Sequence, residues 1–247
     1  MSATVLTADL VVLAHEAGSW HLLLVRRGKD PFEGRWALPG GKVGADEDAT
    51  AAARRELREE TGLQVADSEL IPLTWRTAPD RDPRGRYVSL VYAALLPQPQ
   101  QVHGGDDAAA AWWQPLPVPV DSFPDAAAEP HLAFDHAGIL REVLASASLG
   151  RSSVPHIREA TAADHREFLR LLQTHTPAGH SAAGAPAPGP GRRMHVAALG
   201  SFLVGCAGLL PPGTPAATGQ VLVHPRWQGR GIEEQLAAAH AKESSPR

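Results

Sequence analysis

The segment DEDATAAARRELREETGL, residues 46–63, constrains the fold more than any other part of this 247-residue chain. Its pattern predicts a helix from Asp46 to Thr61, with Asp46 as the N-cap, acidic residues in the first turn and Gly62 as the stop. At about 100° per residue, the apolar stripe of this helix overlaps an arc that carries three glutamates. These are Glu56, Glu59 and Glu60. The three carboxylates therefore do not lie on the solvated back of the helix.

Crowded carboxylates repel one another, so the cluster needs an explanation. A charged run that faces solvent is the usual one, but a carboxylate close to a core needs a partner. A single pairing of Arg55 with Glu59 at (i, i+4) would not neutralise three. Mg²⁺ or Mn²⁺ would, because hard divalent cations take oxygen ligands. Such ions suit phosphate chemistry, and the glycines Gly40 and Gly41 would let a loop backbone approach a metal or a phosphate closely.

Residues 41–63, GKVGADEDATAAARRELREETGL, resemble the signature of the Nudix hydrolases at each of its fixed positions. Those positions are Gly41, Glu47, Arg55, Glu56, Leu57, Glu59, Glu60, Gly62 and Leu63. The resemblance implies an α/β fold, an α/β/α sandwich around a mixed sheet. It also implies cleavage of a nucleoside diphosphate linked to another moiety, with Mg²⁺ or Mn²⁺ as the cofactor.

The resemblance also implies roles for individual residues. The implied metal ligands are Glu56, Glu59, Glu60 and the carbonyl of Gly40. Glu56 is alternatively the general base, and Arg55, with Glu47, would hold the arrangement in place. Glu56, Glu59 and Arg55 are therefore the expected catalytic residues. The family often recruits one more acidic residue from a loop, for which Asp106 and Asp107 are the candidates, although an acidic turn in solvent explains those two equally well.

Four arginines after the motif are predicted to bind the phosphates, because the planar guanidinium fork suits a phosphate group. They are Arg76, Arg81, Arg84 and Arg86, and a solvated loop is the alternative for each. Three tryptophans could stack on adenine, although a strand tryptophan more often packs in the core. They are Trp75, Trp112 and Trp113. His131, Asp135 and His136 are expected to be structural, because on a helix the ring of His136 points away from Asp135.

The substrate is less constrained than the reaction. Pro79, sixteen positions beyond the motif, resembles a marker of the ADP-ribose pyrophosphatases. The leading prediction is therefore hydrolysis of ADP-ribose to AMP and ribose 5-phosphate. Nucleoside triphosphates, other dinucleotides and a non-catalytic role as an ADP-ribose sensor remain open.

The pattern along the chain predicts two domains, a Nudix domain over 1–147 and a second domain over 156–247, joined by a linker at 148–155. In the first, strands are expected at 4–14, 20–26, 70–77, 86–96 and 111–116, and a second helix at 131–147. In the second, a strand at 155–159 and a helix at 162–174 precede a flexible loop at 177–193, two short strands, a strand at GQVLV and a helix near 230–241.

Residues 221–240, VLVHPRWQGRGIEEQLAAAH, resemble the acetyl-CoA-binding segment of the GNAT acetyltransferases, and 156–172 resemble the start of that fold. The matching positions are Gln228, Gly229 and Gly231. Glu233 departs from the pattern, because a carboxylate adds negative charge where helix amides would meet a pyrophosphate. The chain ends at Arg247, before the further strands of that family. The second domain is therefore expected to be incomplete, with acetyl transfer and acetyl-CoA binding not expected and an open sheet edge that could pair with a second copy.

The composition excludes several classes. A net charge of -4 gives no general attraction to nucleic acid or anionic membranes, and no apolar stretch reaches the roughly 20 residues that span a bilayer. Cys206 is the only cysteine, so an intramolecular disulfide and a cysteine-based zinc site are excluded. The expectation is a cytoplasmic protein with a nucleoside diphosphate-linked small molecule as its partner, no nucleic acid or membrane partner, and a homodimer as one option.

Overall fold

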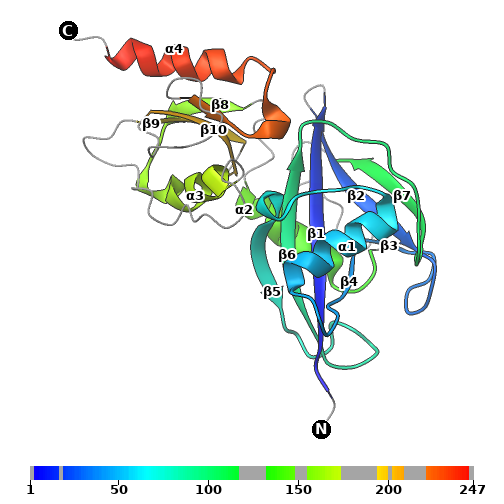
Figure 1. Cartoon of the computed structure of the whole chain (residues 1–247). Helices are drawn as coiled ribbons and strands as arrows, with labels where there is room; N and C mark the ends of the chain where they lie inside the picture. The colour runs from blue at the N-terminus through cyan, green and yellow to red at the C-terminus, as the bar shows by residue number, and fades with distance from the viewer. Residues whose placement is uncertain are drawn as a thin grey trace. The chain divides into compact units, whose positions relative to one another are not determined.

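The structure is a computed structural model that describes residues 3–16, 19–116, 132–147, 155–173, 194–199, 202–208 and 221–244. It contains two compact units, Met1–Ala145 and Ser146–Arg247, each with its own sheet (Figure 1). The predicted loop at 177–193 and residues 148–154 of the predicted linker lie outside the described residues.

The first unit is built on a seven-stranded mixed sheet, as predicted. Its strands are β1 (Val5–Glu16), β2 (Ser19–Arg27), β3 (Trp36–Ala37), β4 (Gly40–Lys42), β5 (Ile71–Arg76), β6 (Tyr87–Leu96) and β7 (Ala108–Pro115). The order is β3-β2-β1-β6-β5, with β4 paired to β1 and β7 paired to β2. β1 and β6 are parallel, and the other pairs are antiparallel. The strand predicted from residue 111 begins three residues earlier, at Ala108.

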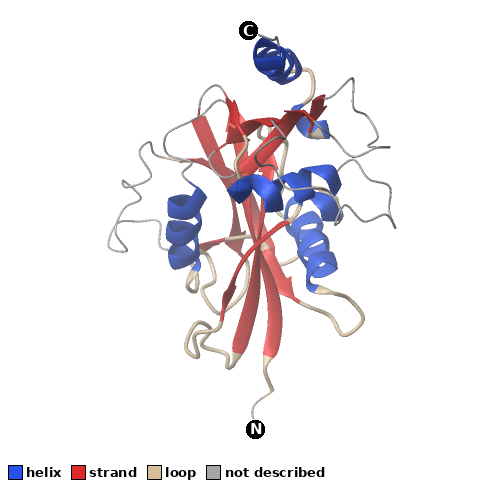
Figure 2. Ribbon diagram, turned by 90° about the vertical axis from the view of Figure 1, so that its left-hand side faces the viewer, coloured by secondary structure: helices blue, strands red, loops and turns tan. Residues whose placement is uncertain are grey.

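Two helices flank this sheet, α1 (Ala49–Thr61) and α2 (His136–Ala147), which gives the predicted α/β/α sandwich (Figure 2). α1 ends as predicted, since Gly62 has a φ of 76° in the left-handed region. Its predicted N-cap was wrong: the cap is Asp48, whose carboxylate accepts the amide proton of Ala51 at 2.8 Å. The first turn accordingly contains no acidic residue. No helix in the described parts of the chain is both long and apolar enough to cross a membrane.

Asp48→Ala is expected to destabilise the protein by about 1 kcal/mol, the usual cost of losing an N-cap hydrogen bond. Asp46→Ala is the matched control and should change the free energy of unfolding very little, because residue 46 precedes the helix. Urea denaturation of both variants measures the difference. A larger loss in Asp46→Ala would restore the N-cap predicted from the sequence.

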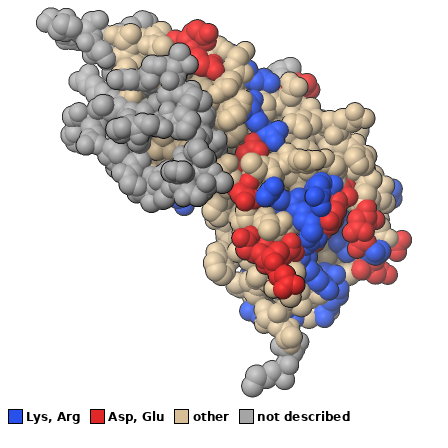
Figure 3. Space-filling view, viewed as in Figure 1, with Lys and Arg blue, Asp and Glu red and all other residues tan. Residues whose placement is uncertain are grey.

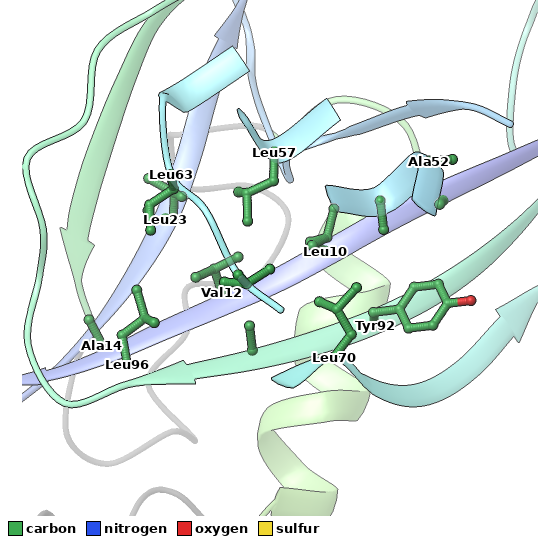
Figure 4. Packing of buried hydrophobic residues seen from close by; sticks show 14 residues of the cluster. Leu10, Val12, Ala14, Leu23, Ala52, Leu57, Leu63, Leu70, Tyr92 and Leu96 are labelled. Carbon is green, nitrogen blue, oxygen red and sulfur yellow. The ribbon is translucent and has the colours of Figure 1, made fainter. Parts of the chain in front are cut away.

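The core of the first unit fixes which face of α1 meets the sheet. Leu57 is fully buried and packs in one cluster with Leu10 and Val12 of β1 (Figure 4). Glu60 lies one turn after Leu57 on the same side of the helix and is only 8% exposed. Packing of the leucine therefore carries a carboxylate into the protein.

The second unit contains a four-stranded antiparallel sheet of order β11-β10-β9-β8. Its elements are β8 (His156–Glu159), α3 (His165–Gln173), β9 (Met194–Leu199), β10 (Phe202–Gly208), β11 (Val221–Val223) and α4 (Ile232–Ser244). Phe168 and Leu171 of α3 pack in one core cluster with Val196 and Leu203. The helix predicted from 162 begins as a 3-10 turn, Ala162–Asp164, which precedes α3.

The ion pair between Arg158 of β8 and Asp164 of that turn is expected to make the stability of the second unit depend on pH. Hydrogen bonds from Arg158, at 2.7 and 2.8 Å, lower the pKa of Asp164 to about 2, and Thr161 adds to the effect. A carboxyl group whose pKa is lower in the folded state than its ordinary value near 3.9 stabilises the fold above about pH 4, and this contribution disappears as the pH falls towards 2.

Asp164→Asn is therefore expected to cost about 2 kcal/mol at pH 6, with the difference from wild type shrinking between about pH 4 and pH 2. Denaturant titrations across this range measure it. Glu159→Gln, at a neighbouring exposed position, should show no such convergence. A constant difference for Asp164→Asn down to pH 2 would contradict the proposed role of the ion pair.

Candidate functional site

A cavity of about 320 Å³ lies between β1, β2, β4, α1 and the loops after β5 and β6. Its acidic lining residues are Asp9, Glu56, Glu60, Asp82, Asp106 and Asp107, and its basic ones are Arg27, Lys42, Arg81 and Arg84. Acidic and basic side chains also alternate over the visible surface of this unit on the side of α1 (Figure 3). The cavity thus combines oxygen ligands for a cation with donors for an anion.

Two of the three predicted helix glutamates share this cavity. Glu60 accepts the amide proton of Gly40 at 2.9 Å, and burial raises the pKa of Glu60 to about 8, with Glu56 and Asp9 adding negative charge nearby. Burial also raises the pKa of Glu56. A cation bound in the cavity would favour the charged form of both carboxyl groups.

Glu59 does not line the cavity. Its carboxylate accepts from Arg55 at 3.0 Å and from Arg58 at 3.4 Å. Arg55 pairs with more carboxylates than the single (i, i+4) partner Glu59 considered from the sequence. It also bonds Glu56 at 2.8 Å and Glu47 at 2.7 and 3.1 Å. Within the described residues, no three His, Cys, Asp or Glu side chains are arranged to hold a metal ion. Glu56 and Glu60 are brought together, and Glu59 is held by arginines instead.

The two glycines before α1 shape the wall of the cavity. A side chain at Gly41 would collide with the Glu56 carboxyl group, and one at Gly40 would collide with the backbone of β1. Gly40 also has a φ of 152°, and its amide is what bonds Glu60. The absence of side chains at these two glycines lets the carboxyl groups of Glu56 and Glu60 lie against β4, and carboxylate oxygens are ligands that suit Mg²⁺ or Mn²⁺.

The four predicted phosphate-binding arginines separate into two groups. Arg81 and Arg84 line the cavity, but the Arg81 side chain is only 4% exposed and pairs with Asp9 at 3.2 Å and Asp135 at 2.7 Å. Arg76 and Arg86 do not line it. Arg76 pairs with Glu142 at 2.9 Å, and Arg86 donates to the carbonyl of Thr77 at 2.6 Å.

The tryptophans do not contribute to the cavity either. Trp75 and Trp112 are 69% and 56% exposed, so the core alternative was also wrong for them. Trp113 is partly buried against the core and donates to the carbonyl of Gln100.

The loop after β6 brings both predicted acidic residues to the cavity. Asp107 pairs with Lys29, whereas the negative charge of Asp106 contributes to the raised pKa of Glu56. The loop approaches α1 closely, because a side chain at Gly105 would collide with the carbonyl of Glu59. Asp106 is therefore the better placed of the two to act beside Glu56.

Sequence reasoning did not identify Asp9, Arg27, Asp82 or Phe134 as cavity residues. Asp9 carried a signal, since it interrupts a buried apolar strand and a buried carboxylate needs partners. It accepts from Ser89 at 2.6 Å as well as from Arg81. The others carried no local signal.

Asp135, which precedes α2, and His136, its first residue, both have structural contacts. Asp135 holds Arg81. The Nδ1 atom of His136 accepts the amide proton of Leu38 at 2.9 Å, and burial lowers the pKa of this histidine. His131 lies outside the described residues.

In the second unit, the predicted acetyl-CoA segment forms a turn before α4. Gly229 and Gly231 have φ values of 71° and 75°, and Gln228 donates to the carbonyl of Val223 at 3.2 Å. The carboxylate of Glu233 accepts the amide proton of Gly229 at 3.2 Å. The acetyltransferase resemblance of this unit stays a prediction.

Several known proteins are similar to the chain, among them the following three. The ADP-ribose pyrophosphatase of Methanocaldococcus jannaschii is 37% identical over 123 residues, 50% of this chain and 65% of that protein. The ADPR responsive transcriptional repressor NtrR of Acinetobacter baylyi is 30% identical over 145 residues, 57% of this chain and 53% of the repressor. The bifunctional NMN adenylyltransferase/ADP ribose pyrophosphatase of Francisella tularensis, complexed with AMP and a Mn ion, aligns with a TM-score of 0.50 and 28% identity over 59% of this chain and 42% of that one.

The chain spans less than two thirds of the length of each of these relatives. The NUDIX domain model matches residues 4–135, more than half of the chain. The matched region contains the mixed sheet, α1 and the cavity-lining carboxylates. From this match and the fold, we conclude that the chain belongs to the Nudix family.

Proposed function

We propose that this protein hydrolyses the diphosphate of a nucleoside diphosphate derivative with the help of a divalent cation, and that ADP-ribose, giving AMP and ribose 5-phosphate, is its main substrate. The main support for this proposal is that Glu56 and Glu60 line the same cavity as Arg27 and Arg84. Carboxylates suit a hard cation and guanidiniums suit phosphate oxygens. Similarity to two ADP-ribose pyrophosphatases supports the choice of substrate.

Each group has a separate task in this proposal. Glu56 and Glu60 supply oxygens for Mg²⁺ or Mn²⁺, and the Francisella complex with a Mn ion supports this choice of cation. When bound, such an ion lowers the pKa of water and neutralises phosphate charge. Arg55 positions Glu56. Glu56 or Asp106 accepts the proton of the attacking water.

The direct test is to incubate the full chain and Mg²⁺ with ADP-ribose, NADH, diadenosine polyphosphates and nucleoside triphosphates, and to separate the products. AMP formed mainly from ADP-ribose is the expected result. Faster turnover of triphosphates or of another dinucleotide would contradict the assignment of ADP-ribose as the main substrate. It would still support hydrolysis of a diphosphate bond as the reaction.

A second candidate, a non-catalytic ADP-ribose sensor, is favoured by the similarity to the ADPR responsive repressor. Glu59 is also bonded to arginines rather than placed in the cavity. Calorimetry with ADP-ribose, with and without Mg²⁺, separates the two functions. Tight binding without hydrolysis of any substrate in the panel would select the sensor.

A further inference from the structure

Arg27, the last residue of β2, is a cavity guanidinium without a carboxylate partner. Its Nε donates to the carbonyl of Pro31 at 2.7 Å and its Nη2 to that of Lys29 at 3.3 Å. No acidic group of the described residues forms an ion pair with it within 4.0 Å. Burial and the positive charge of Arg84 lower the pKa of Arg27. This charge in the cavity lacks a close anionic partner.

Arg84 also has N–H donors that no described residue accepts from. Its Nε and Nη2 bond the two carboxylate oxygens of Asp82 at 3.0 and 2.6 Å, so the group is held rigidly. No acceptor of the described residues bonds its Nη1. Asp82 is buried, with a side chain only 3% exposed, which fixes the orientation of the Arg84 guanidinium.

Phe134 contacts both guanidiniums, and the Cζ atom of Arg84 also lies 4.8 Å from the ring centroid of Tyr87. The Cζ atom of Arg27 lies 4.8 Å from the ring centroid of Phe134, and that of Arg84 lies 5.5 Å from it. A ring face attracts cations, so Phe134 offsets part of the repulsion between two like charges. The ring is itself braced by Phe32 in an edge-to-face contact at 4.9 Å.

The backbone at this aromatic pair is strained. Phe134 has a φ of 54° and Phe32 a φ of 64°, in the left-handed region that bulky side chains rarely adopt. Such conformations persist only where the surroundings enforce them, and they are concentrated at functional sites. The Phe134 ring lies at the wall of the cavity.

We propose that Arg27 and Arg84 together bind a phosphate group through their remaining N–H donors, and that Phe134 is the positioning residue that holds the pair. Two oxygens of one phosphate can accept from two guanidiniums in charge-assisted hydrogen bonds. The ligand class is a phosphate or a phosphate monoester. Its assignment as the phosphate that leaves with the sugar rests on the proposed function, whereas binding itself does not.

The experiment is calorimetric titration of the full chain, without metal, with inorganic phosphate and with ribose 5-phosphate. Arg27→Gln is expected to weaken both by roughly tenfold or more, since hydrogen bonds to a charged group are lost. Arg26→Gln is the matched control, because Arg26 precedes Arg27 on β2, bonds the carbonyl of Gly34 and does not line the cavity. It should bind both probes as wild type does.

Phe134 needs a readout that a structural role alone would not change. Phe134→Leu should weaken phosphate binding, whereas Phe134→Tyr, which keeps the ring, should preserve it. Equal melting temperatures for the two variants exclude a general loss of fold. Equal phosphate affinities for Phe134→Leu and Phe134→Tyr would show that the ring does not position the guanidiniums.

The outcomes separate this inference from the proposed function. If phosphate binding depends on Arg27 but the protein hydrolyses no substrate of the panel, the phosphate site is supported and the proposed enzymatic activity is contradicted. The phosphate site is contradicted if Arg27→Gln does not change phosphate binding, or if wild type does not bind phosphate in the millimolar range. If that protein still hydrolyses ADP-ribose, the proposed enzymatic activity is supported.

Discussion

Glu60→Gln is expected to lower kcat/KM for ADP-ribose by about 10³-fold while the fold is retained. The carboxyl group is buried in the cavity, where a bound cation would favour its charged form and solvent would screen the interaction little. Glutamine keeps an oxygen that can accept the amide proton of Gly40. Steady-state kinetics with Mg²⁺, together with the melting temperature, measure activity and folding separately.

Glu59→Gln is the matched control on the same helix. Because Glu59 bonds Arg55 and Arg58 and does not line the cavity, its loss should lower kcat/KM by about tenfold at most. A loss as large as that of Glu60→Gln would support the ligand role implied by the family resemblance. Its carboxylate would then have to leave Arg55 when a metal binds. Unchanged activity in Glu60→Gln would contradict the proposed reaction.

Arg81→Ala is expected to destabilise the first unit by about 3–5 kcal/mol, the usual cost of removing one partner of a buried ion pair. Two carboxylates, Asp9 and Asp135, would lose their common cation. Asp9 would keep only Ser89 as a hydrogen-bond donor among the described residues. Thermal and urea denaturation would show the loss as a melting temperature lower by roughly 10 °C.

Arg86→Ala provides the comparison, since Arg86 follows the same loop and makes an exposed bond to a carbonyl. Its effect on stability should be within about 0.5 kcal/mol. An Arg81→Ala variant that unfolds like wild type and shows only a raised KM would contradict the structural role. It would restore Arg81 as the phosphate-binding residue predicted from the sequence.

The elements of the first unit were largely predictable, because their signals are local. Gly62 ends α1 through a left-handed conformation that glycine adopts at low cost. Alternating and continuous apolar runs identified β1, β2, β5 and β6. The N-cap was misplaced because the stretch before α1 offers several acidic residues, and only the geometry of the turn selects Asp48.

The composition of the site was less predictable. Arg81 looked like a substrate-binding residue on a loop, yet its partners Asp9 and Asp135 are 72 and 54 positions away. Arg27 and Phe134 likewise meet only after β2 and the segment before α2 fold onto the same sheet. A residue whose role depends on a distant partner carries no periodic or local signal.

The sequence by itself determined the family, the helix that carries the glutamates and the kind of ligand they suit, because spacing along one helix sets which side chains share a face. Only the tertiary structure decided which carboxylates line the cavity and which arginines form ion pairs with carboxylates of the protein. The physical reason is that burial and charge compensation depend on neighbours from several strands and loops, and only the folded sheet brings them together.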